Sequence, residues 1–174
     1  MCRRAAFLFL VAANAALVSA CSPERSDGPF PPVKSLKVLG KLPGSWTVTS
    51  LDGKEVDMDQ LRGKVVFINR WATWCPPCVG EMPGIQALHD SVKDSDIAFL
   101  IVTTEKAAKV KEFVKKKGWT LPVHIATEGV PPILNPEFIP VSYVVNRKGE
   151  VVFEFPGAMD WDTDQARKFL KSIP

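Results

Sequence analysis

The chain has 174 residues, of which 46% are hydrophobic and 24% are charged, and its formal net charge is +3. This composition is typical of a globular domain with one core. Residues 1–20 hold two of the 22 basic residues and no acidic one, so a chain without them carries a net charge of +1, which gives no reason to expect a nucleic-acid partner.

The first twenty residues have the features of an export signal. Arg3 and Arg4 form a short basic start, and an apolar run follows from 5 to 18. The run is too short to span a bilayer comfortably, and it ends at the small residues Ser19 and Ala20, as signal peptides do before their cleavage site. Residues 1–20 are therefore predicted to be a signal peptide.

The residues around the expected cleavage site resemble the lipobox of bacterial lipoproteins. In Val18-Ser19-Ala20-Cys21 the cysteine would be acylated and become the first mature residue. This resemblance implies a periplasm-facing protein of the cell envelope, held at a membrane by lipid on Cys21, because several acyl chains anchor a protein stably. Residues 21–43 are expected to be the lipid anchor and an extended tether, since the four prolines between 23 and 32 favour an unpacked chain.

Residues 44–174 are predicted to form one folded domain. Alternating apolar and polar residues, continuous apolar runs and helical spacing indicate its elements. In chain order, these are a hairpin over 46–56, a strand over 65–68, a helix from the cysteine motif to about 92, a strand over 97–102, a helix over 106–117, a hairpin over 142–155 and a C-terminal helix.

This order of elements predicts an α/β fold with one central mixed sheet and helices on both faces, which makes three layers. The first hairpin is an N-terminal extension of that sheet. Gly118 is expected to end the second helix. Asp162 and Gln165 are three residues apart, which favours a capping box at the start of the last helix.

Cys75 and Cys78 are the only thiols that remain once Cys2 leaves with the signal and Cys21 is acylated. A disulfide between residues so close in sequence closes too short a loop to stabilise a fold much. The pair is therefore better explained by chemistry than by stability.

The residues between the cysteines place the pair at the start of a helix. Pro76 and Pro77 fit the first helical turn, where a missing N–H costs nothing. Cys75 then lies at the helix N-terminus, where unpaired N–H groups and the macrodipole favour an anion and lower the pKa of a thiol. Cys78 lies one turn further on, shielded, and is expected to resolve a mixed disulfide.

Metal and haem sites explain the cysteine pair less well. Attachment of haem needs a histidine where Val79 stands, and a structural zinc site needs a second pair of ligands. No metal and no cofactor are therefore expected. A copper-handling protein that uses the two cysteines as soft ligands stays open as an alternative, with Met82 as the one further ligand nearby.

The segment Trp71-Ala72-Thr73-Trp74-Cys75-Pro76-Pro77-Cys78, followed by Glu81-Met82-Pro83, resembles the TlpA-type branch of the thioredoxin superfamily. The resemblance covers residues 44–174. It implies a thioredoxin-like fold and a membrane-tethered, exported thiol–disulfide oxidoreductase, similar to the reductases of cytochrome c maturation. It also implies a monomer whose partners are client proteins with disulfides and a transmembrane electron-donor protein.

The resemblance further implies the substrate groove. The family's cis-proline falls on Pro140, and a proline there leaves the backbone of Ile139 to pair with an extended substrate peptide. The residues expected to bind substrate are Trp74, Pro76, Pro77, Ile139, Pro140 and Gly157.

Two residues directly before the motif are informative, since Asn69 differs from ordinary thioredoxins and Arg70 differs from the TlpA-type family. Asn69 stands where ordinary thioredoxins have a buried aspartate, so the proton acceptor must lie elsewhere. Glu81 is the candidate, because it lies on the buried stripe of its helix, where burial raises the pKa of a carboxyl. Arg70 replaces the usual aromatic, and the sequence does not decide between a surface position and a charge in the groove.

The function predicted from these features is reduction of disulfides in exported proteins, within cytochrome c or oxidase maturation. The same pair also suits a thiol oxidant or an isomerase, because the direction of exchange depends on the reduction potential.

Overall fold

The computed structural model describes residues 29–174, so the expected signal peptide and Cys21 lie outside the described range. The strands are β1 (Gly40–Lys41), β2 (Thr47–Ser50), β3 (Glu55–Asp57), β4 (Val65–Arg70), β5 (Ile97–Thr103), β6 (Val123–Ile125), β7 (Val141–Val145) and β8 (Glu150–Pro156). The helices are α1 (Pro76–Val92), α2 (Ala107–Lys117) and α3 (Asp164–Ser172), with short 3-10 helices η1 (Val33–Ser35), η2 (Asp59–Leu61) and η3 (Pro132–Leu134).

All eight strands join in one sheet, in the order β1-β8-β7-β4-β5-β6-β2-β3. β5 pairs in parallel with β4 and with β6, and the other neighbouring strands pair antiparallel. The α/β fold with a mixed sheet, expected from the order of elements, is confirmed.

The centre of the sheet is β4, in which all six residues are buried. Because side chains alternate along a strand, β4 contributes side chains to two hydrophobic cores, one on each face of the sheet. Phe67 lies in the core that contains Ile85 of α1 and Leu170 of α3. Ile68 lies in the core on the opposite face, together with Val48 of β2.

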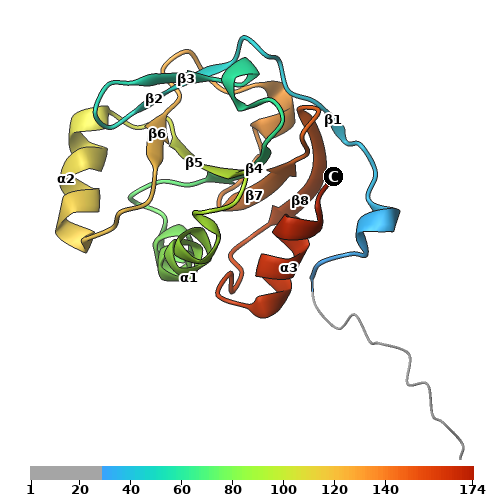
Figure 1. Cartoon of the computed structure of the whole chain (residues 1–174). Helices are drawn as coiled ribbons and strands as arrows, with labels where there is room; N and C mark the ends of the chain where they lie inside the picture. The colour runs from blue at the N-terminus through green and yellow to red at the C-terminus, as the bar shows by residue number, and fades with distance from the viewer. Residues whose placement is uncertain (1–28) are drawn as a thin grey trace, which may run out of the picture.

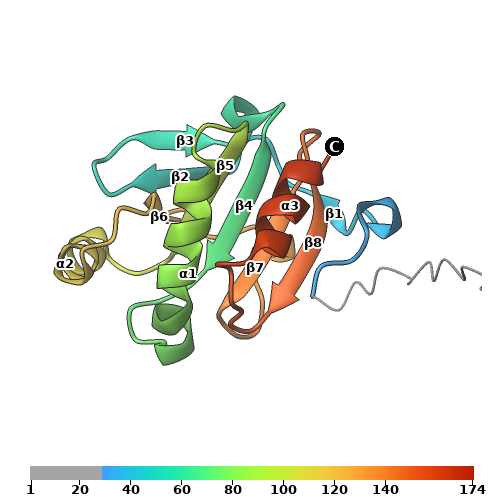
Figure 2. The same ribbon diagram turned by 60° about the horizontal axis from the view of Figure 1, so that its bottom comes forward.

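The two faces of the sheet are covered by different kinds of structure. In Figure 2, α1 lies in front of β4 and β5, and α3 lies in front of β7 and β8. The sheet curls, so the β2–β3 hairpin packs over the opposite face, where Trp46 and Leu134 join the core of Ile68. The hairpin, η2 and η3 form this third layer, and α2 lies at the edge of the sheet beside β6 (Figure 1). The hairpin therefore covers the face of the sheet opposite α1 and α3.

The folded domain begins earlier than residue 44. Residues 29–43, expected to belong to an extended tether, lie against the domain: β1 pairs with β8, and Leu42 is buried. The ring of Phe30 lies 4.9 Å from that of Phe169 and 5.9 Å from that of Trp161. The prolines do favour extended backbone, but extended backbone also suits an edge strand, and the apolar side chains between the prolines dock.

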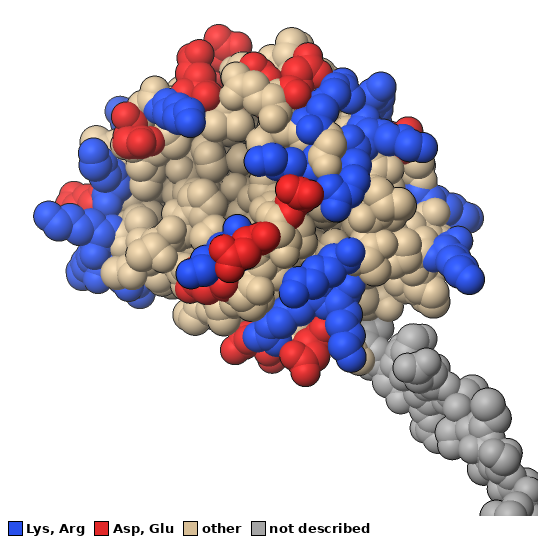
Figure 3. Space-filling view, in the orientation of Figure 1, with Lys and Arg blue, Asp and Glu red and all other residues tan. Residues whose placement is uncertain are grey.

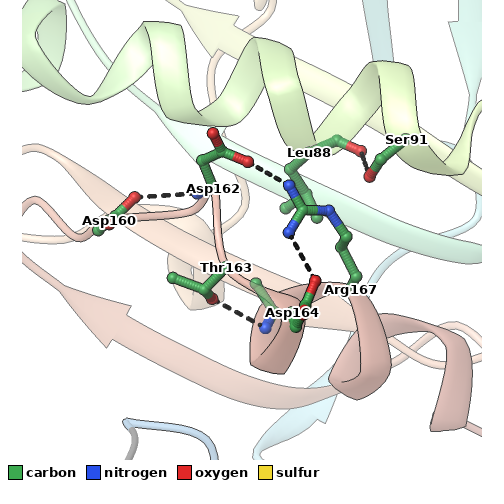
Figure 4. Close-up of polar contacts among 8 residues, drawn as sticks. Leu88, Ser91, Asp160, Asp162, Thr163, Asp164 and Arg167 are labelled. Atoms are coloured by element: carbon green, nitrogen blue, oxygen red, sulfur yellow. Dashed lines mark hydrogen bonds and ion pairs between the residues drawn. The ribbon is translucent and has the colours of Figure 1, made fainter.

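The start of α3 also differs from the expectation. Its N-cap is Thr163, whose Oγ1 accepts a hydrogen bond from the N–H of Ala166 at 3.1 Å, so Asp162 and Gln165 do not form a capping box. Asp162 instead pairs with Arg167, which also contacts Asp164 (Figure 4). Threonine is among the residues favoured at the N-cap, and here the chain enters the helix one residue later.

The face of the molecule shown in Figure 3 has no large region of a single charge sign. Small groups of basic side chains alternate with acidic ones there (Figure 3). Within residues 29–174, no helix has the length and apolar character that crossing a membrane requires.

Candidate active site

The cysteine pair lies where β4 ends and α1 begins. Cys75 is the N-cap of α1, with extended backbone at φ −97° and ψ 103°, and Pro76 and Pro77 occupy the first two helical positions. The two cysteine Cα atoms are 5.3 Å apart, and their sulfurs form a disulfide. The position predicted for Cys75 at the N-terminus of a helix is confirmed.

The helix end is directed at the sulfur of Cys75. Because the two prolines lack N–H groups, the amide of Cys78 is the first free donor of α1, and it donates to Cys75 Sγ at 3.3 Å. The carbonyl oxygen of Ile139 lies 3.8 Å from the same sulfur. Cys78 is fully buried in the core. A thiolate at Cys75 therefore has one backbone hydrogen-bond donor. Both cysteines are buried, Cys75 at 3% exposure and Cys78 at 0%.

An apolar rim adjoins the disulfide. Trp74 is 67% exposed, and Phe138, from the chain before β7, is 59% exposed. The Ile139–Pro140 peptide bond is cis, as the resemblance implied. Sequence reasoning missed Phe138, although an aromatic residue two positions before the expected cis-proline was a usable signal.

Gly157 directly follows β8 and contacts Pro140. Its backbone has φ +93°, and its N–H donates to the carbonyl oxygen of Pro140 at 2.8 Å. The hydrogen bond holds Pro140 in place. Gly157 is therefore joined to Pro140 through its backbone.

Glu81 is a buried acid with three hydrogen-bond donors. It is 5% exposed, and burial raises the pKa of its carboxyl above the usual value of 4.5. Asn69 Nδ2 donates to Oε1 at 2.9 Å, while Trp161 Nε1 and the N–H of Met159 donate to Oε2 at 3.1 and 3.2 Å. These bonds oppose the rise in pKa but do not overcome burial.

Asn69 connects this acid to the sheet. Its Nδ2 also lies 2.9 Å from the hydroxyl oxygen of Ser142, and its Oδ1 has no partner among the described residues. Sequence reasoning named Asn69 and Glu81 but missed Ser142, Met159 and Trp161. The last three lie more than 60 positions further along the chain, and no local pattern joins them to the cysteine motif.

A surface groove gives the Glu81 region access to solvent. It runs between the first turns of α1 and residues 158–160, and Pro77, Gly80, Glu81 and Gly84 line it on the helix side. Because two of these positions are glycines, they add no side chain to narrow the groove on the helix side.

Arg70 is buried at 7% exposure and does not lie at a surface edge. Burial lowers the pKa of its guanidinium from its ordinary value. It lines a second groove, together with Trp74, Phe138 and Ile139. Of the two alternatives left by the sequence, a charge at the groove is the correct one.

The described residues offer little for a metal. No group of three or more histidine, cysteine, aspartate or glutamate side chains in 29–174 could hold one. Met82, the further ligand considered for copper, is fully buried in the hydrophobic core. The copper alternative gains no support from its position.

Comparison with known proteins agrees with this geometry. The model of the family described as Redoxin matches residues 27–170. Thiol-disulfide oxidoreductase ResA from Bacillus thuringiensis strain Al Hakam is 32% identical over 143 residues, which cover 78% of each chain. ResA from Geobacillus kaustophilus strain HTA426 is 31% identical over 142 residues, covering 80% of each.

Solved structures agree as well. A thiol:disulfide interchange protein of the thioredoxin family from Chlorobium tepidum TLS superposes with a TM-score of 0.63 at 25% identity, covering 79% of this chain and 96% of that one. The thioredoxin-like fold is therefore confirmed. The chain belongs to the Redoxin family, and it is a thiol–disulfide oxidoreductase with a Cys75–Cys78 pair.

Proposed function

We propose that the protein reduces disulfides in exported client proteins while it is anchored to a membrane by lipid on Cys21. The observation that carries this proposal is the Cys75–Cys78 disulfide at the amino end of α1, beside the exposed side chains of Trp74 and Phe138. A buried dithiol at an apolar rim suits exchange with another protein chain, because the partner's side chains cover the rim as the sulfurs meet.

The exchange has two steps. The thiolate of Cys75 attacks a client disulfide, forms a mixed disulfide and releases one client sulfur as a thiolate. The thiol of Cys78 then loses its proton, attacks the sulfur of Cys75 and releases the second client sulfur. The client gains two electrons and two protons, and the protein is left with the Cys75–Cys78 disulfide. A membrane-embedded dithiol donor would reduce it again.

Glu81 is the proposed acceptor of the Cys78 proton. It lies three residues after Cys78 on the same helix, and its raised pKa brings the carboxylate closer to a thiol in basicity. The groove along Gly80 and Gly84 provides a route by which the proton reaches water.

The anchor would hold the domain close to the membrane. Cys21 is eight positions before residue 29, where the described domain starts, and eight residues span at most about 30 Å. The catalytic end would thus work near the bilayer, within reach of a transmembrane electron donor.

Trapping tests the proposed reaction. Cys78→Ser should accumulate a mixed disulfide with client proteins through Cys75, because the resolving thiol is missing. The matched Cys75→Ser variant should accumulate none. Equal trapping by both variants, or by neither, would contradict the assigned order of attack.

The direction of exchange needs a separate measurement. A thiol oxidant or isomerase would use the same pair at a less negative potential. Equilibration with glutathione gives the potential of the Cys75–Cys78 couple. We expect it to be more reducing than about −200 mV, below the range of protein disulfide isomerase. A value near −120 mV would instead indicate an oxidant.

A further inference from the structure

A second groove adjoins the cysteine motif. The residues that matter here are Arg70, Trp74, Glu105, Glu137, Phe138 and Ile139. Trp74 directly precedes Cys75, and the carbonyl of Ile139 lies 3.8 Å from Cys75 Sγ. A client chain whose disulfide meets Cys75 therefore has flanking residues beside this groove, which we call the Arg70 groove.

The guanidinium of Arg70 is not fully paired. Its Nη1 donates to the carbonyl oxygen of Leu134 at 3.0 Å, and its buried Nε has no hydrogen-bond partner among the described residues. Within 29–174, no carboxylate forms an ion pair with it. An arginine keeps its charge in a protein, and a buried charge without a partner is costly.

The acidic side chains of the groove are engaged elsewhere or are in water. Glu105 accepts hydrogen bonds from the N–H and hydroxyl of Thr73 and pairs with Lys109 at 2.6 Å. Glu137 is exposed on the chain between η3 and β7. The buried positive charge of Arg70 is therefore the uncompensated charge of the groove.

We propose that the Arg70 groove binds an aspartate or glutamate side chain of the client segment that flanks the disulfide being exchanged. The inference rests on the proposed function, because the client must dock at Cys75. The planar guanidinium offers donors in the geometry that a carboxylate accepts. Trp74 and Phe138 would cover the neighbouring apolar part of the segment, which excludes water and strengthens the charge pair.

Peptide disulfides test the proposal. Each peptide carries glutamate or glutamine at one of the three positions before or after its cysteine and is otherwise identical. The reduced protein is mixed with each peptide, and the rate of a single turnover is measured. At one position or more, we expect the wild-type protein to reduce the glutamate peptide about tenfold faster than the glutamine peptide.

The glutamate-to-glutamine rate ratio within each variant is the readout, so a general change in rate divides out. Arg70→Gln should bring the ratio to about one, and Arg70→Lys should keep part of it. Lys148→Gln removes an equal charge from the turn between β7 and β8, which lies beside the start of β4 and away from Arg70. This variant should leave the ratio unchanged. A ratio of one in the wild-type protein at every position, or an unchanged ratio in Arg70→Gln, would overturn the proposal.

A neutral substrate separates this inference from the proposed function. Hydroxyethyl disulfide has no charge, so its reduction by the wild-type protein needs the Cys75–Cys78 pair and draws nothing from a charge in the Arg70 groove. If it is reduced while glutamate gives no advantage, the Arg70 groove is wrong and the reductase stands. If the wild-type protein does not reduce it, the proposed reaction itself fails.

Discussion

Asn69 and Arg70 are neighbours at the end of β4, yet they lead to two differently built buried sites. Asn69 donates to the carboxylate of Glu81, which receives two further hydrogen bonds from the chain before α3. Arg70 points to the other face of the sheet, where its Nε has no partner among the described residues. Glu81 has three hydrogen-bond donors from its own fold, whereas Arg70 has one acceptor, the carbonyl of Leu134, and no carboxylate among the described residues.

The difference indicates two kinds of role. The hydrogen-bond donors around Glu81 stabilise its carboxylate against burial. Glu81 can therefore take up and release a proton without a bound client to supply such donors. The guanidinium of Arg70 lacks such compensation inside the protein, and an external carboxylate would supply it. The following predictions test this contrast, beginning with the largest expected effect.

The packing around Glu81 depends on the N-terminal segment of the described chain. The ring of Phe30 lies 5.8 Å from Phe153, 4.9 Å from Phe169 and 5.9 Å from Trp161, which donates to Glu81. Phe30→Ala should lower the free energy of unfolding by about 2–3 kcal/mol, because it removes a partly buried ring and leaves a gap. Urea unfolding of the oxidised protein measures it.

The control for Phe30→Ala lies in the same segment. Leu39 is 52% exposed, so Leu39→Ala should change the free energy of unfolding by less than about 0.5 kcal/mol. Equal losses for the two variants would mean that residues 29–43 do not support the site through Phe30.

The pH dependence of stability tests how far hydrogen bonds compensate the Glu81 carboxylate for its burial. Because burial raises its pKa above 4.5, the folded state binds the proton more tightly than the unfolded state. Stability should therefore fall as the pH rises from 4.5 through the raised pKa, with a slope of at most about 1.4 kcal/mol per pH unit. Glu81→Gln should remove this contribution, as urea unfolding between pH 4.5 and 8 would show.

His124 provides an internal check on that experiment. Burial lowers its pKa, so the unfolded state binds the proton more tightly, and stability should rise with pH up to about 6.5. The two effects have opposite signs. Subtracting the Glu81→Gln curve from the wild-type curve isolates the acid, and a flat difference would show that hydrogen bonding fully offsets its burial.

Removing the charge of Arg70 tests the other side of the contrast. Arg70→Met keeps an unbranched side chain that fills the first part of the same space but removes a buried charge that has no ion-pair partner among the described residues. It also deprives the carbonyl of Leu134 of a donor, which costs about 1 kcal/mol. Because the desolvation of a charge costs more, we expect a net gain of about 1 kcal/mol in the free energy of unfolding. Lys148→Met, on an exposed turn, should change it by less than about 0.5 kcal/mol. A clear loss in Arg70→Met would mean that the guanidinium is well satisfied.

The sequence predicted the parts of the site that arise from local patterns. Pro76 and Pro77 fixed the start of α1, and the spacing of Glu81 with Ile85 placed the acid on the buried stripe. Both features depend on residues within a few turns of one helix, where periodicity specifies which side chains face the core.

The remaining parts depend on contacts between distant segments. The donors Met159 and Trp161 reach Glu81 only because α3 packs beside α1. The burial of Arg70 depends on η3, from which Leu134 accepts its hydrogen bond. The packing of Phe30 depends on Phe153 of β8, Phe169 of α3 and Trp161 of the chain before α3. None of these follows from local propensity, because tertiary packing determines each of them.

Two glycines of α1 give the smallest expected effects and the finest test of how Glu81 is held. Alanine is about 1 kcal/mol more favourable than glycine inside a helix. A Cβ at Gly80 would meet no described heavy atom within 4 Å, so Gly80→Ala should gain that amount. A Cβ at Gly84 would lie 3.3 Å from the backbone nitrogen of Trp161 and 3.4 Å from that of Asp162.

Backbone at that distance must move by a few tenths of an ångström, and the segment that moves carries the donors to Glu81. Gly84→Ala should therefore gain less than Gly80→Ala in urea unfolding, by about 0.5–1 kcal/mol. If the two gains are equal, the backbone around Trp161 moves without a measurable cost in stability. The hydrogen bonds from this segment to Glu81 are then not what distinguishes that acid from Arg70.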